Sequence, residues 1–442
     1  MNNLIILPHQ LFKEEYFKKY NINNVILWEH PQYFTKYKFN KKKIILHRAS
    51  MKYYYDYLSK IGKYNINYIN FNSDIKLNKK NNNYYIFDPI DKINIKKNNK
   101  DINIIESPNF ILTKKDYEKY RLKTDKFIFN NFYLWSKKHI NLYPELKSLD
   151  KMNRQVYQGN NIPNLPNLNK KDKKYIDEAI KYTEKYFSKN YGNTNNFKYP
   201  ISYESSSKWL DDFFKNKLDL FGPYQDFTRK NEVFMFHSVL SSSINIGLLN
   251  PNEIISKISK FEDKVRINSF EGYLRQLFWR EYQRYTYIYV DFFKYNYFNN
   301  KKKLNSKWYK GNLKIKPIDD LIKSGFDTGY IHHIGRLMFI GNFMNIYRLD
   351  PKEGFKWFME FSCDSYEWVM CQNVLDMVFF VTGGLTMRKP YITKTNYILK
   401  NSDYKFEDKW CNKWNQMYDS FLKDNKDKLW KFRYHFPTLK KL

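Results

Sequence analysis

Histidine and arginine side chains interrupt an apolar stretch in the C-terminal half of the chain, YIHHIGRLMFIGN at residues 330–342. Apolar residues recur there at helical spacing, which predicts a largely buried helix. His333, Arg336 and Leu337 stand three and four residues apart and therefore share one face of that helix. Imidazole can exchange protons near neutral pH. The alternative, a core helix whose histidines are merely hydrogen-bonded, stays open on this stretch alone.

The guanidinium of Arg336 needs a partner, because an unpaired charge on a buried face is costly. Asp364 lies in KWFMEFSCDSYEWVMCQN, a stretch that is otherwise mostly apolar and aromatic. A buried charge is tolerated best beside its opposite. We therefore expect an ion pair between Arg336 and Asp364.

A serine-rich stretch, VFMFHSVLSSSINIGLL at residues 233–249, precedes these two segments. Four of its serines lie near the start of a predicted helix, where hydroxyls and free backbone N–H groups can hold an anion. They are Ser238, Ser241, Ser242 and Ser243. A plain serine-capped helix is the alternative interpretation.

The helix predicted at residues 271–285, EGYLRQLFWREYQRY, combines arginine, glutamine and tryptophan around its apolar stripe. Gln276, Trp279 and Arg280 could bind a base or another flat aromatic ligand through amide hydrogen bonds and stacking. A basic surface helix with a half-buried tryptophan would show the same pattern.

The composition sets outer limits on function. The chain has 442 residues, room for two or three domains, and 77 basic against 45 acidic residues give a formal charge of +32. Lysine is over-used together with Asn, Ile and Tyr, which suggests an AT-rich genome, so we attribute only part of the charge to function. The remainder still favours a polyanionic partner, most simply nucleic acid.

Cys363, Cys371 and Cys411 form no disulfide framework and indicate a reducing compartment. Because they show no CxxC spacing, we expect no metal site built on cysteine. No apolar run approaches the length of a membrane span, and the first ten residues lack a signal-peptide core. These features predict a soluble, intracellular protein, in the cytoplasm, in the nucleus or packaged with DNA, with no membrane partner.

The first part of the chain alternates predicted strands with predicted helices. Short apolar runs predict strands at residues 4–8, 24–28, 43–47, 67–71, 84–87 and 102–105, with helices near 12–20 and at 49–61. This alternation favours an α/β fold with a parallel sheet and helices on both faces. No GxGxxG or GxxxxGK[ST] motif is present, so a standard nucleotide-phosphate loop is not supported.

After Asp116 the sequence becomes helical, aromatic and basic. Residues 141–175 carry several prolines in a polar background, which is typical of a long connector. We therefore predict an α/β domain at residues 1–125, an interdomain connector at 126–175 and an all-α domain at 176–442.

Several motifs, in their order along the chain, resemble the photolyase/cryptochrome family. FEGYLRQLFWREYQRY is similar to the family's flavin-domain helix with its W-R-E-[FY] signature. YIHHIGRLMFIGNF, FGPYQD with FMFHSVLSSSINIGLLNP, and SCDSYEWVMCQNVLDM resemble the branch typified by bacterial (6-4) photolyases. LPHQLF and KKKIILHRASMKYYYDYL resemble the antenna domain of that branch, so the likeness covers essentially the whole chain.

The resemblance implies a Rossmann-like α/β antenna domain followed by an all-α domain that holds FAD in a U-shaped conformation. The implied activity is that of a DNA photolyase, in which blue light drives an electron from reduced FAD to a UV pyrimidine lesion. The lesion must be flipped out of the helix, because the damaged bonds are inaccessible inside the stack. UV-damaged DNA would be the partner of the basic surface, and we expect a monomer.

The resemblance also carries over site residues. Those that match flavin-contacting positions are Tyr224, Ser238, Leu240, Ser241, Arg280, Arg336, Asp364 and Asn373. Arg336 and Asp364 match the ion pair beside the isoalloxazine, and Asn373 is the candidate to face flavin N5. Trp357 and Trp308 match a photoreduction chain running from the flavin towards the surface, and core packing is the alternative role for each.

Three further residues match positions that act on the lesion. Gln276 stands where (6-4) enzymes carry Gln and the best-known cyclobutane-dimer enzymes carry Glu. His333 falls on the catalytic histidine of (6-4) photolyases, where cyclobutane-dimer enzymes have Asn, and Trp279 matches the tryptophan against which the lesion packs. These matches favour repair of the (6-4) photoproduct. Cyclobutane-dimer repair, and a cryptochrome-type flavin photoreceptor without repair activity, remain alternatives.

The chain also departs from that branch. Bacterial members hold an iron–sulfur cluster through four cysteines, and the matching positions here are Lys316, Lys405, Asp408 and Cys411. One thiolate cannot hold such a cluster, so we expect none. The antenna domain has diverged, and the sequence leaves open whether it keeps a lumazine-like chromophore.

Overall fold

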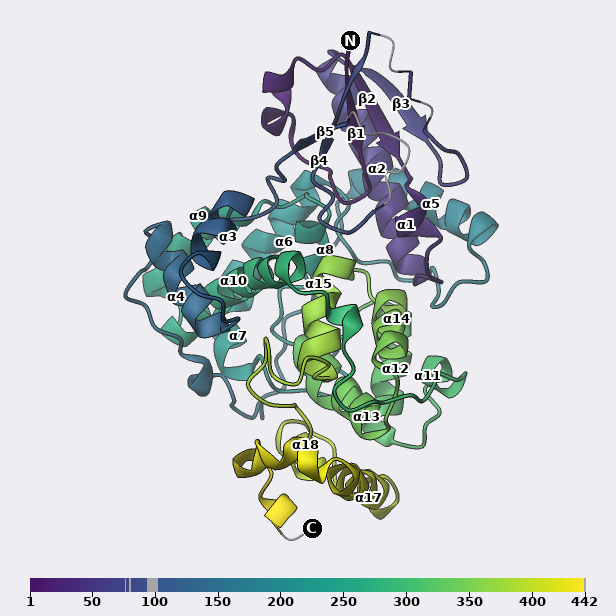
Figure 1. The fold of residues 1–442 in the computed structure, drawn as a ribbon. Helices are drawn as coiled ribbons and strands as arrows, with labels where there is room; N and C mark the ends of the chain where they lie inside the picture. The colour runs from purple at the N-terminus through teal and green to yellow at the C-terminus, as the bar shows by residue number, and fades with distance from the viewer. Residues whose placement is uncertain (76, 79–80, 94–101, 441–442) are drawn as a thin grey trace.

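The N-terminal part of the chain is built on a five-stranded parallel sheet (Figure 1). A computed structural model describes residues 1–75, 77–78, 81–93 and 102–440. The strands are β1 (Asn2–Ile6), β2 (Asn24–Trp28), β3 (Asn65–Ile69), β4 (Asn83–Phe87) and β5 (Ile102–Ile105), in the order β3-β2-β1-β4-β5. The α/β prediction is confirmed, and five of the six predicted strands agree with the structure within two residues.

The sixth predicted strand, at residues 43–47, is wrong, because this segment is the start of a helix. Helix α2 (Lys41–Ile61) begins after Asn40, whose side chain accepts a hydrogen bond from the Lys42 N–H at 2.9 Å. A short apolar run does not distinguish a buried helix turn from a strand. The predicted helix at 49–61 is the remainder of α2. The predicted helix near 12–20 is two short 3₁₀ turns, η1 (Glu14–Tyr16) and η2 (Lys18–Tyr20).

The rest of the chain is helical, as predicted. Besides α1 (Pro31–Phe34), the helices with their bounds are α3 (Lys114–Arg121), α4 (Phe129–His139), α5 (Lys173–Tyr186), α6 (Tyr203–Asn216), α7 (Leu218–Tyr224), α8 (Ser241–Asn245), α9 (Pro251–Ile258), α10 (Ile267–Tyr289), α11 (Lys307–Lys310), α12 (Lys316–Thr328), α13 (Asn342–Ile346), α14 (Pro351–Phe361), α15 (Glu367–Met370), α16 (Thr395–Lys400), α17 (Asp408–Asp424) and α18 (Lys426–Trp430). Two π-helical segments, η7 (Gly335–Gly341) and η8 (Cys371–Val378), complete the set used below.

The predicted connector, residues 126–175, contains packed structure. Within it, Tyr133 of α4 forms a buried apolar cluster with Leu274 and Phe278 of α10. Helix α5 follows and lies against α2, where Glu178 pairs with Arg48 at 2.6 Å. The segment is therefore anchored on α10 through α4 and on α2 through α5. The domain boundaries themselves stay a prediction.

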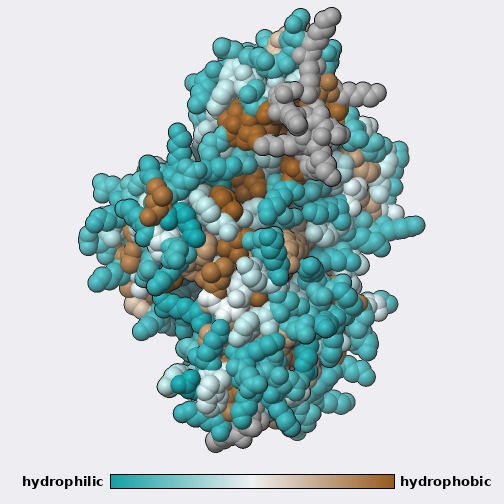
Figure 2. All heavy atoms as spheres, viewed as in Figure 1, coloured by the Kyte–Doolittle hydropathy of each residue, from teal (hydrophilic) through white to brown (hydrophobic). Residues whose placement is uncertain are grey.

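The two termini lie at opposite ends of the molecule, with α17 and α18 forming the base (Figure 1). Figure 2 shows a mostly hydrophilic face whose apolar residues gather near its middle, between the sheet and the helices. Among the described residues, no helix combines the length and the apolar character needed to cross a membrane.

Candidate functional site

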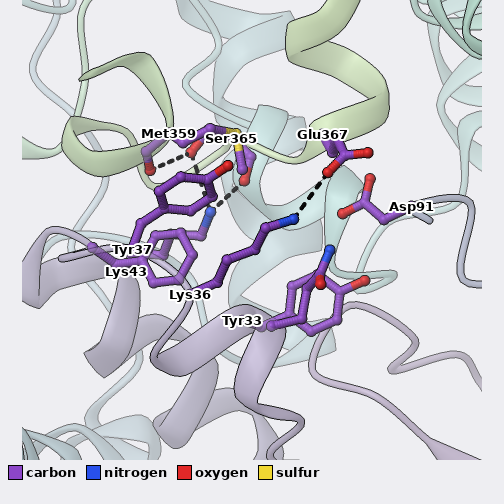
Figure 3. A pocket seen from close by; sticks show the side chains of 10 residues that line it. Tyr33, Lys36, Tyr37, Lys43, Asp91, Met359, Ser365 and Glu367 are labelled. Carbon is purple, nitrogen blue, oxygen red and sulfur yellow. Dashed lines mark hydrogen bonds and ion pairs between the residues drawn. The ribbon is translucent and has the colours of Figure 1, made fainter. Parts of the chain in front are cut away.

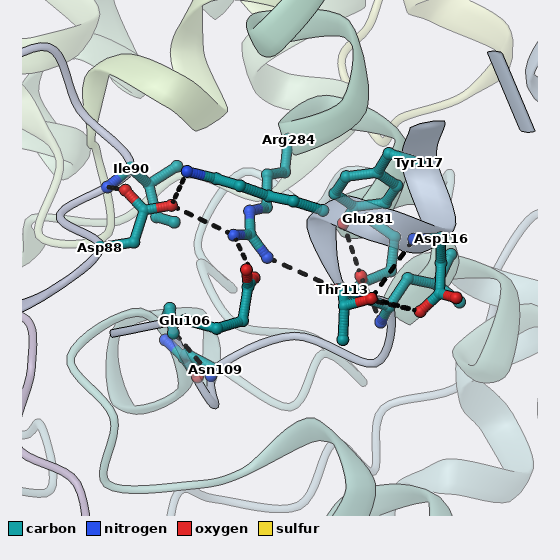
Figure 4. A network of polar contacts seen from close by, with 12 residues as sticks. Asp88, Ile90, Glu106, Asn109, Thr113, Asp116, Tyr117, Glu281 and Arg284 are labelled. Atoms are coloured by element: carbon teal, nitrogen blue, oxygen red, sulfur yellow. Dashed lines mark hydrogen bonds and ion pairs between the residues drawn. The ribbon is translucent and has the colours of Figure 1, made fainter. Parts of the chain in front are cut away.

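Helix α10 carries three of the predicted site residues and is fixed by a buried polar network (Figure 4). The Glu281 carboxylate accepts hydrogen bonds from the backbone N–H groups of Ile111 and Leu112, at 3.0 and 3.1 Å, and from the Tyr117 hydroxyl at 2.8 Å. The segment before α3 and α3 itself are thereby tied to one carboxylate. Burial raises the pKa of Glu281, although these donors and the nearby Arg280 oppose that shift.

Arg284, one turn further along α10, reaches in the same direction. Its guanidinium pairs with Glu106 at 2.7 Å and with Asp88 at 3.3 Å, just beyond the carboxyl ends of β5 and β4 (Figure 4). The network holds α10 against the end of the sheet and so sets the direction in which Gln276, Trp279 and Arg280 project.

Replacement of Glu281 by glutamine tests this anchoring. The amide can accept from two of the three donors, but its NH₂ group must then face another donor. We expect a loss of about 1–3 kcal/mol in the free energy of unfolding, measured by urea denaturation. A change below 0.5 kcal/mol would contradict the anchoring role.

Arg336 and Asp364 form the expected ion pair, with nitrogen–oxygen distances of 3.0 and 3.1 Å. Two hydroxyls, those of Ser241 (at 2.6 Å) and Ser362, also donate to the Asp364 carboxylate. Burial alone would raise the pKa of Asp364, but the attraction of Arg336 and the hydrogen bonds from Arg336, Ser241 and Ser362 hold it below its ordinary value. This carboxylate therefore stays ionised and links η7, α8 and the segment before α15.

Arg280 joins the same cluster through Asn245, the last residue of α8. Asn245 donates from Nδ2 to the Asp364 carbonyl at 2.9 Å and accepts from Arg280 Nε at 3.1 Å. The Arg280 guanidinium lies over the rings of Phe110 and Trp368, and burial lowers its pKa to about 10. Its Nη2 is buried and has no hydrogen-bond partner among the residues that the structure describes.

Other buried polar atoms close to this cluster in the chain also lack a protein partner. They are Ser242 Oγ, Ser243 Oγ and Asn109 Oδ1. Asn109 is joined to the cluster directly, because its Nδ2 donates to the Ile244 carbonyl at 2.8 Å and its own carbonyl accepts from Arg280. Buried polar groups are usually satisfied, so this concentration of unpaired donors and acceptors fits a polar ligand.

Gln276 and Trp279 lie on α10 four residues and one residue before Arg280. Gln276 Nε2 donates to Gln225 Oε1 at 3.4 Å, a long hydrogen bond. Trp279 Nε1 donates to Asn373 Oδ1 at 3.2 Å, and its ring meets the Phe129 ring at a centroid distance of 4.4 Å. Asn373 in turn is held through its Nδ2 to the Val369 carbonyl at 3.0 Å.

His333 lies at the surface of the site, with 41% of its side chain exposed. Its Nε2 is 3.1 Å from Asp226 Oδ1, which orients the ring. The neighbouring His332 is buried, and its ring stacks on that of His237 at 4.9 Å. Burial lowers the pKa of His237 to about 3 and that of His332 well below its ordinary value, so both rings are neutral.

Two π-helical segments present site residues. Arg336 lies in η7 and Asn373 in η8. A Cβ at Gly341 would lie 2.6 Å from the Val378 side chain, so this glycine permits the close approach of η7 to η8. π-Helical turns are rare and occur frequently at functional sites.

Three predicted cofactor residues have separate surroundings. Tyr224 packs against the rings of Tyr157 and Phe236, and the Ser238 hydroxyl bonds to Tyr273. Leu240 is fully buried, and its carbonyl accepts from the Ile244 N–H of α8. The structure thus joins Ser241, Arg280, Arg336 and Asp364 in one network, whereas Tyr224 and Ser238 contact other residues and Leu240 directly precedes α8.

Trp357 and Trp308 are both completely buried, and Trp357 Nε1 donates to the Trp308 carbonyl at 2.8 Å. The Trp357 ring lies 4.7 Å from that of Phe361, over which the Arg336 guanidinium sits at 5.3 Å. Aromatic rings therefore lead from the ion pair to Trp357. Trp308 extends that path without itself reaching the surface.

A second polar cluster lies where α1 and α2 meet the segment around α15 (Figure 3). Lys43 donates to the carbonyl and hydroxyl oxygens of Ser365, and Lys36 pairs with Glu367 at 3.1 Å. Burial first, then the charge of Glu367, raises the pKa of Asp91 to about 7. The cavity between them is about 10 Å³, the size of a single water, so these side chains chiefly join the two parts of the chain.

The sequence analysis missed five residues that connect the predicted ones: Asn109, Gln225, Asp226, His237 and Asn245. Gln225 and Asp226 lie in the FGPYQD motif, and His237 and Asn245 flank the serine cluster, so these four belong to stretches that the sequence analysis already singles out. Their partners are more than 30 residues away in most cases, as for Asn245 and Asp364, and sequence spacing does not reveal such contacts.

Known proteins resemble this chain in both sequence and fold. A family model described as deoxyribodipyrimidine photo-lyase-related protein matches residues 4–199. A (6-4) photolyase from Agrobacterium fabrum is 32% identical over 271 residues, which cover 58% of this chain and 53% of that protein, so the match spans about half of its length. An uncharacterized protein of Acanthamoeba polyphaga mimivirus, R855, is 53% identical over 91 residues, 21% of this chain and 74% of that one.

The fold extends the likeness to nearly the whole chain. The crystal structure of a bacterial class III photolyase from Agrobacterium tumefaciens superposes with a TM-score of 0.61 at 14% identity, covering 97% of this chain and 91% of that one. The fold agrees with the order of motifs and with the α/β and helical parts described above. Residues 4–199 thus match the deoxyribodipyrimidine photo-lyase-related family, and the chain as a whole has the fold of a photolyase.

Proposed function

We propose that this protein is a light-dependent DNA-repair photolyase that uses reduced FAD and acts on the (6-4) photoproduct. The observation that carries the proposal is the convergence of two sets of residues. Ser241, Arg280, Arg336 and Asp364 form one hydrogen-bonded network. Gln276 and His333, the proposed lesion contacts, are linked to the adjacent residues Gln225 and Asp226.

The first network fits FAD. Arg336 and Asp364 would flank the isoalloxazine, and Ser241, Asn245 and Arg280 would contact the more polar parts of the cofactor. The unpaired Arg280 Nη2 and the unpaired serine hydroxyls supply donors for an anionic, oxygen-rich ligand. When bound and excited by blue light, FAD supplies the electron that splits the lesion.

The second set fits the lesion. The Gln276 amide can both donate to and accept from a flipped-out base, and its long bond to Gln225 is easily exchanged for a base contact. The Trp279 ring offers a stacking surface. His333, exposed and oriented by Asp226, can deliver a proton to the photoproduct.

The excess of basic residues fits a DNA substrate, because phosphate contacts position the duplex around a flipped nucleotide. Trp357 and Trp308 would carry electrons to the cofactor from the protein interior. The monomeric state and the residue facing flavin N5, Asn373, stay predictions.

The most direct test is to purify the protein, record its visible absorption and irradiate it after reduction with oligonucleotides that carry one lesion each. We expect a flavin spectrum and light-dependent loss of the (6-4) photoproduct, with none in darkness. Loss of the cyclobutane dimer alone would move the assignment to that lesion. A flavin spectrum without any repair would indicate a photoreceptor, and a colourless protein would refute the proposal.

Iron content provides a separate prediction. An iron–sulfur cluster of this type needs four thiolates, whereas the chain has three cysteines, in two different regions. We expect less than about 0.1 iron atoms per chain by elemental analysis of anaerobically purified protein. Three or four iron atoms per chain, with the broad absorption of a cluster, would contradict this expectation.

A further inference from the structure

Three histidines from two distant segments meet beside Asp226. His237, His332 and His333, together the histidine cluster, offer ring nitrogens that all lie within 4.8 Å of one another. We propose that the histidine cluster binds a zinc-type divalent transition metal through three imidazoles, leaving a fourth position for water. The sequence analysis, which considered cysteine ligands, assigned no metal to this region.

Each ring in the cluster already has an outer partner, and His237 has one beside each of its two nitrogens. His333 Nε2 lies 3.1 Å from Asp226 Oδ1, and His332 Nε2 lies 3.1 Å from Thr228 Oγ1. The His237 nitrogens lie 3.2 and 3.3 Å from the carbonyl oxygens of Gln225 and Phe234. Metal-bound histidines almost always have such a carboxylate, carbonyl or hydroxyl behind the ring, because it fixes the tautomer and orientation.

The two buried rings, His332 and His237, have ring nitrogens whose hydrogen bonding is poorly satisfied when no ion is bound. His332 is only 3% exposed, and its buried Nδ1 has no hydrogen-bond partner. His237 is 6% exposed, and a neutral ring has one N–H, so it cannot donate to both of its carbonyl neighbours. Buried polar atoms are rarely left in this state, and coordination by a metal would use the free lone pairs.

The donor set selects the kind of ion. Imidazole nitrogen suits zinc, cobalt, nickel and copper, whereas magnesium and calcium require oxygen ligands. Zinc–nitrogen bonds of about 2.0–2.1 Å place tetrahedral ligands about 3.4 Å apart, so the rings must close by a side-chain movement of about 1 Å. His333, the exposed member, can make that movement and marks the route of entry.

The site has a consequence that rests on the proposed function. A metal bound to His333 would occupy one of its ring nitrogens and prevent the imidazole from donating a proton to the lesion. Bound metal and repair of the photoproduct would then exclude each other. Metal binding itself requires neither light nor a lesion, so its failure can be distinguished from failure of the repair proposal.

The test is a titration of the full, tag-free protein with Co²⁺ and with Zn²⁺ in competition with a chromophoric chelator. We expect one equivalent bound, with the visible bands of a tetrahedral or five-coordinate cobalt site that zinc displaces. His333→Ala should abolish the cobalt bands. Asp226→Asn, which alters only the outer partner, should weaken affinity about 10–100-fold.

His139→Ala is the matched control, because His139 makes the same kind of contact, Nε2 to Asp116 Oδ1 at 2.9 Å, on the surface. Its binding should equal that of the wild type. Absence of stoichiometric binding to the wild type would overturn the proposal, and so would equal binding by His333→Ala. Because His333 is exposed, this variant is expected to fold even if changes at the buried His237 are not tolerated.

Discussion

Substitution of His333 by alanine is expected to lower the rate of (6-4) photoproduct repair by about 10²–10⁴-fold, the range associated with a positioned general acid. The side chain is 41% exposed and makes one polar contact, with Asp226, so its removal should change folding stability little. The flavin network lies on other residues, and flavin content should stay at the wild-type level. Repair is measured as photoproduct lost per absorbed photon under single-turnover conditions.

A second substitution separates proton transfer from shape. His333→Gln keeps a polar side chain whose Nε2 can still donate to Asp226, but it cannot exchange a proton near neutral pH. We expect it to be as inactive on the (6-4) photoproduct as His333→Ala. If either variant repairs this lesion at the wild-type rate, His333 has no catalytic role. Both assays are run in the presence of a metal chelator.

Sequence reasoning succeeded where a single physical rule was sufficient. Arg336 and Asp364 were paired in advance because each would otherwise be an uncompensated charge in an apolar segment. The bounds predicted for β2 and β5 agree with those observed, because a short apolar run bounded by polar residues is a common signature of a buried strand.

The error at residues 43–47 shows where local pattern is insufficient. The run KIILH has the apolar character of a strand, and Ile44, Ile45 and Leu46 are indeed all buried. What decides the conformation is Asn40, which caps α2 and starts the helix. The sequence analysis considered the apolar run alone and not this capping residue. Lys43, at the start of the run, is 1% exposed and is held by Ser365.

The residues that complete the site could not be inferred from spacing. Asp226 meets His333 across 107 positions, and Asn245 meets Asp364 across 119. Such contacts depend on how α8, α10, η7 and the chain before α15 pack, and hydrophobic periodicity does not define that packing. The π-helical form of η7 and η8 was equally hidden, because their apolar residues resemble those of an α-helix.

Loss of either partner of the Arg336–Asp364 pair should have the largest effect on the cofactor site. Arg336→Ala leaves the Asp364 carboxylate, 12% exposed, with only serine hydroxyls and no countercharge, and Asp364→Asn leaves the guanidinium unpaired. Each is expected to cost about 3–5 kcal/mol of unfolding free energy and to yield protein without flavin. The measurements are urea denaturation and the ratio of flavin to protein absorbance.

Two comparisons make this prediction specific. Arg266→Ala removes an exposed pair with Asp219, 51% and 46% exposed, and should cost less than about 1 kcal/mol with flavin retained. The double variant Arg336→Ala/Asp364→Asn removes both charges, and its loss of unfolding free energy should be smaller than the sum of the two single losses by about 0.5–3 kcal/mol. Additive losses would mean that the two groups act independently.

The Arg336–Asp364 pair should also be sensitive to acid. The pKa of Asp364 is lowered in the folded protein, so the stability that its carboxylate contributes depends on the carboxylate being ionised. That contribution is fully present above the carboxyl's ordinary pKa of about 4 and is lost as the pH falls through the lower folded-state value. Flavin release from the wild type should therefore begin only below about pH 4. In Asp364→Asn, any residual flavin binding should not weaken over this acidic range, because the titrating carboxyl group is gone.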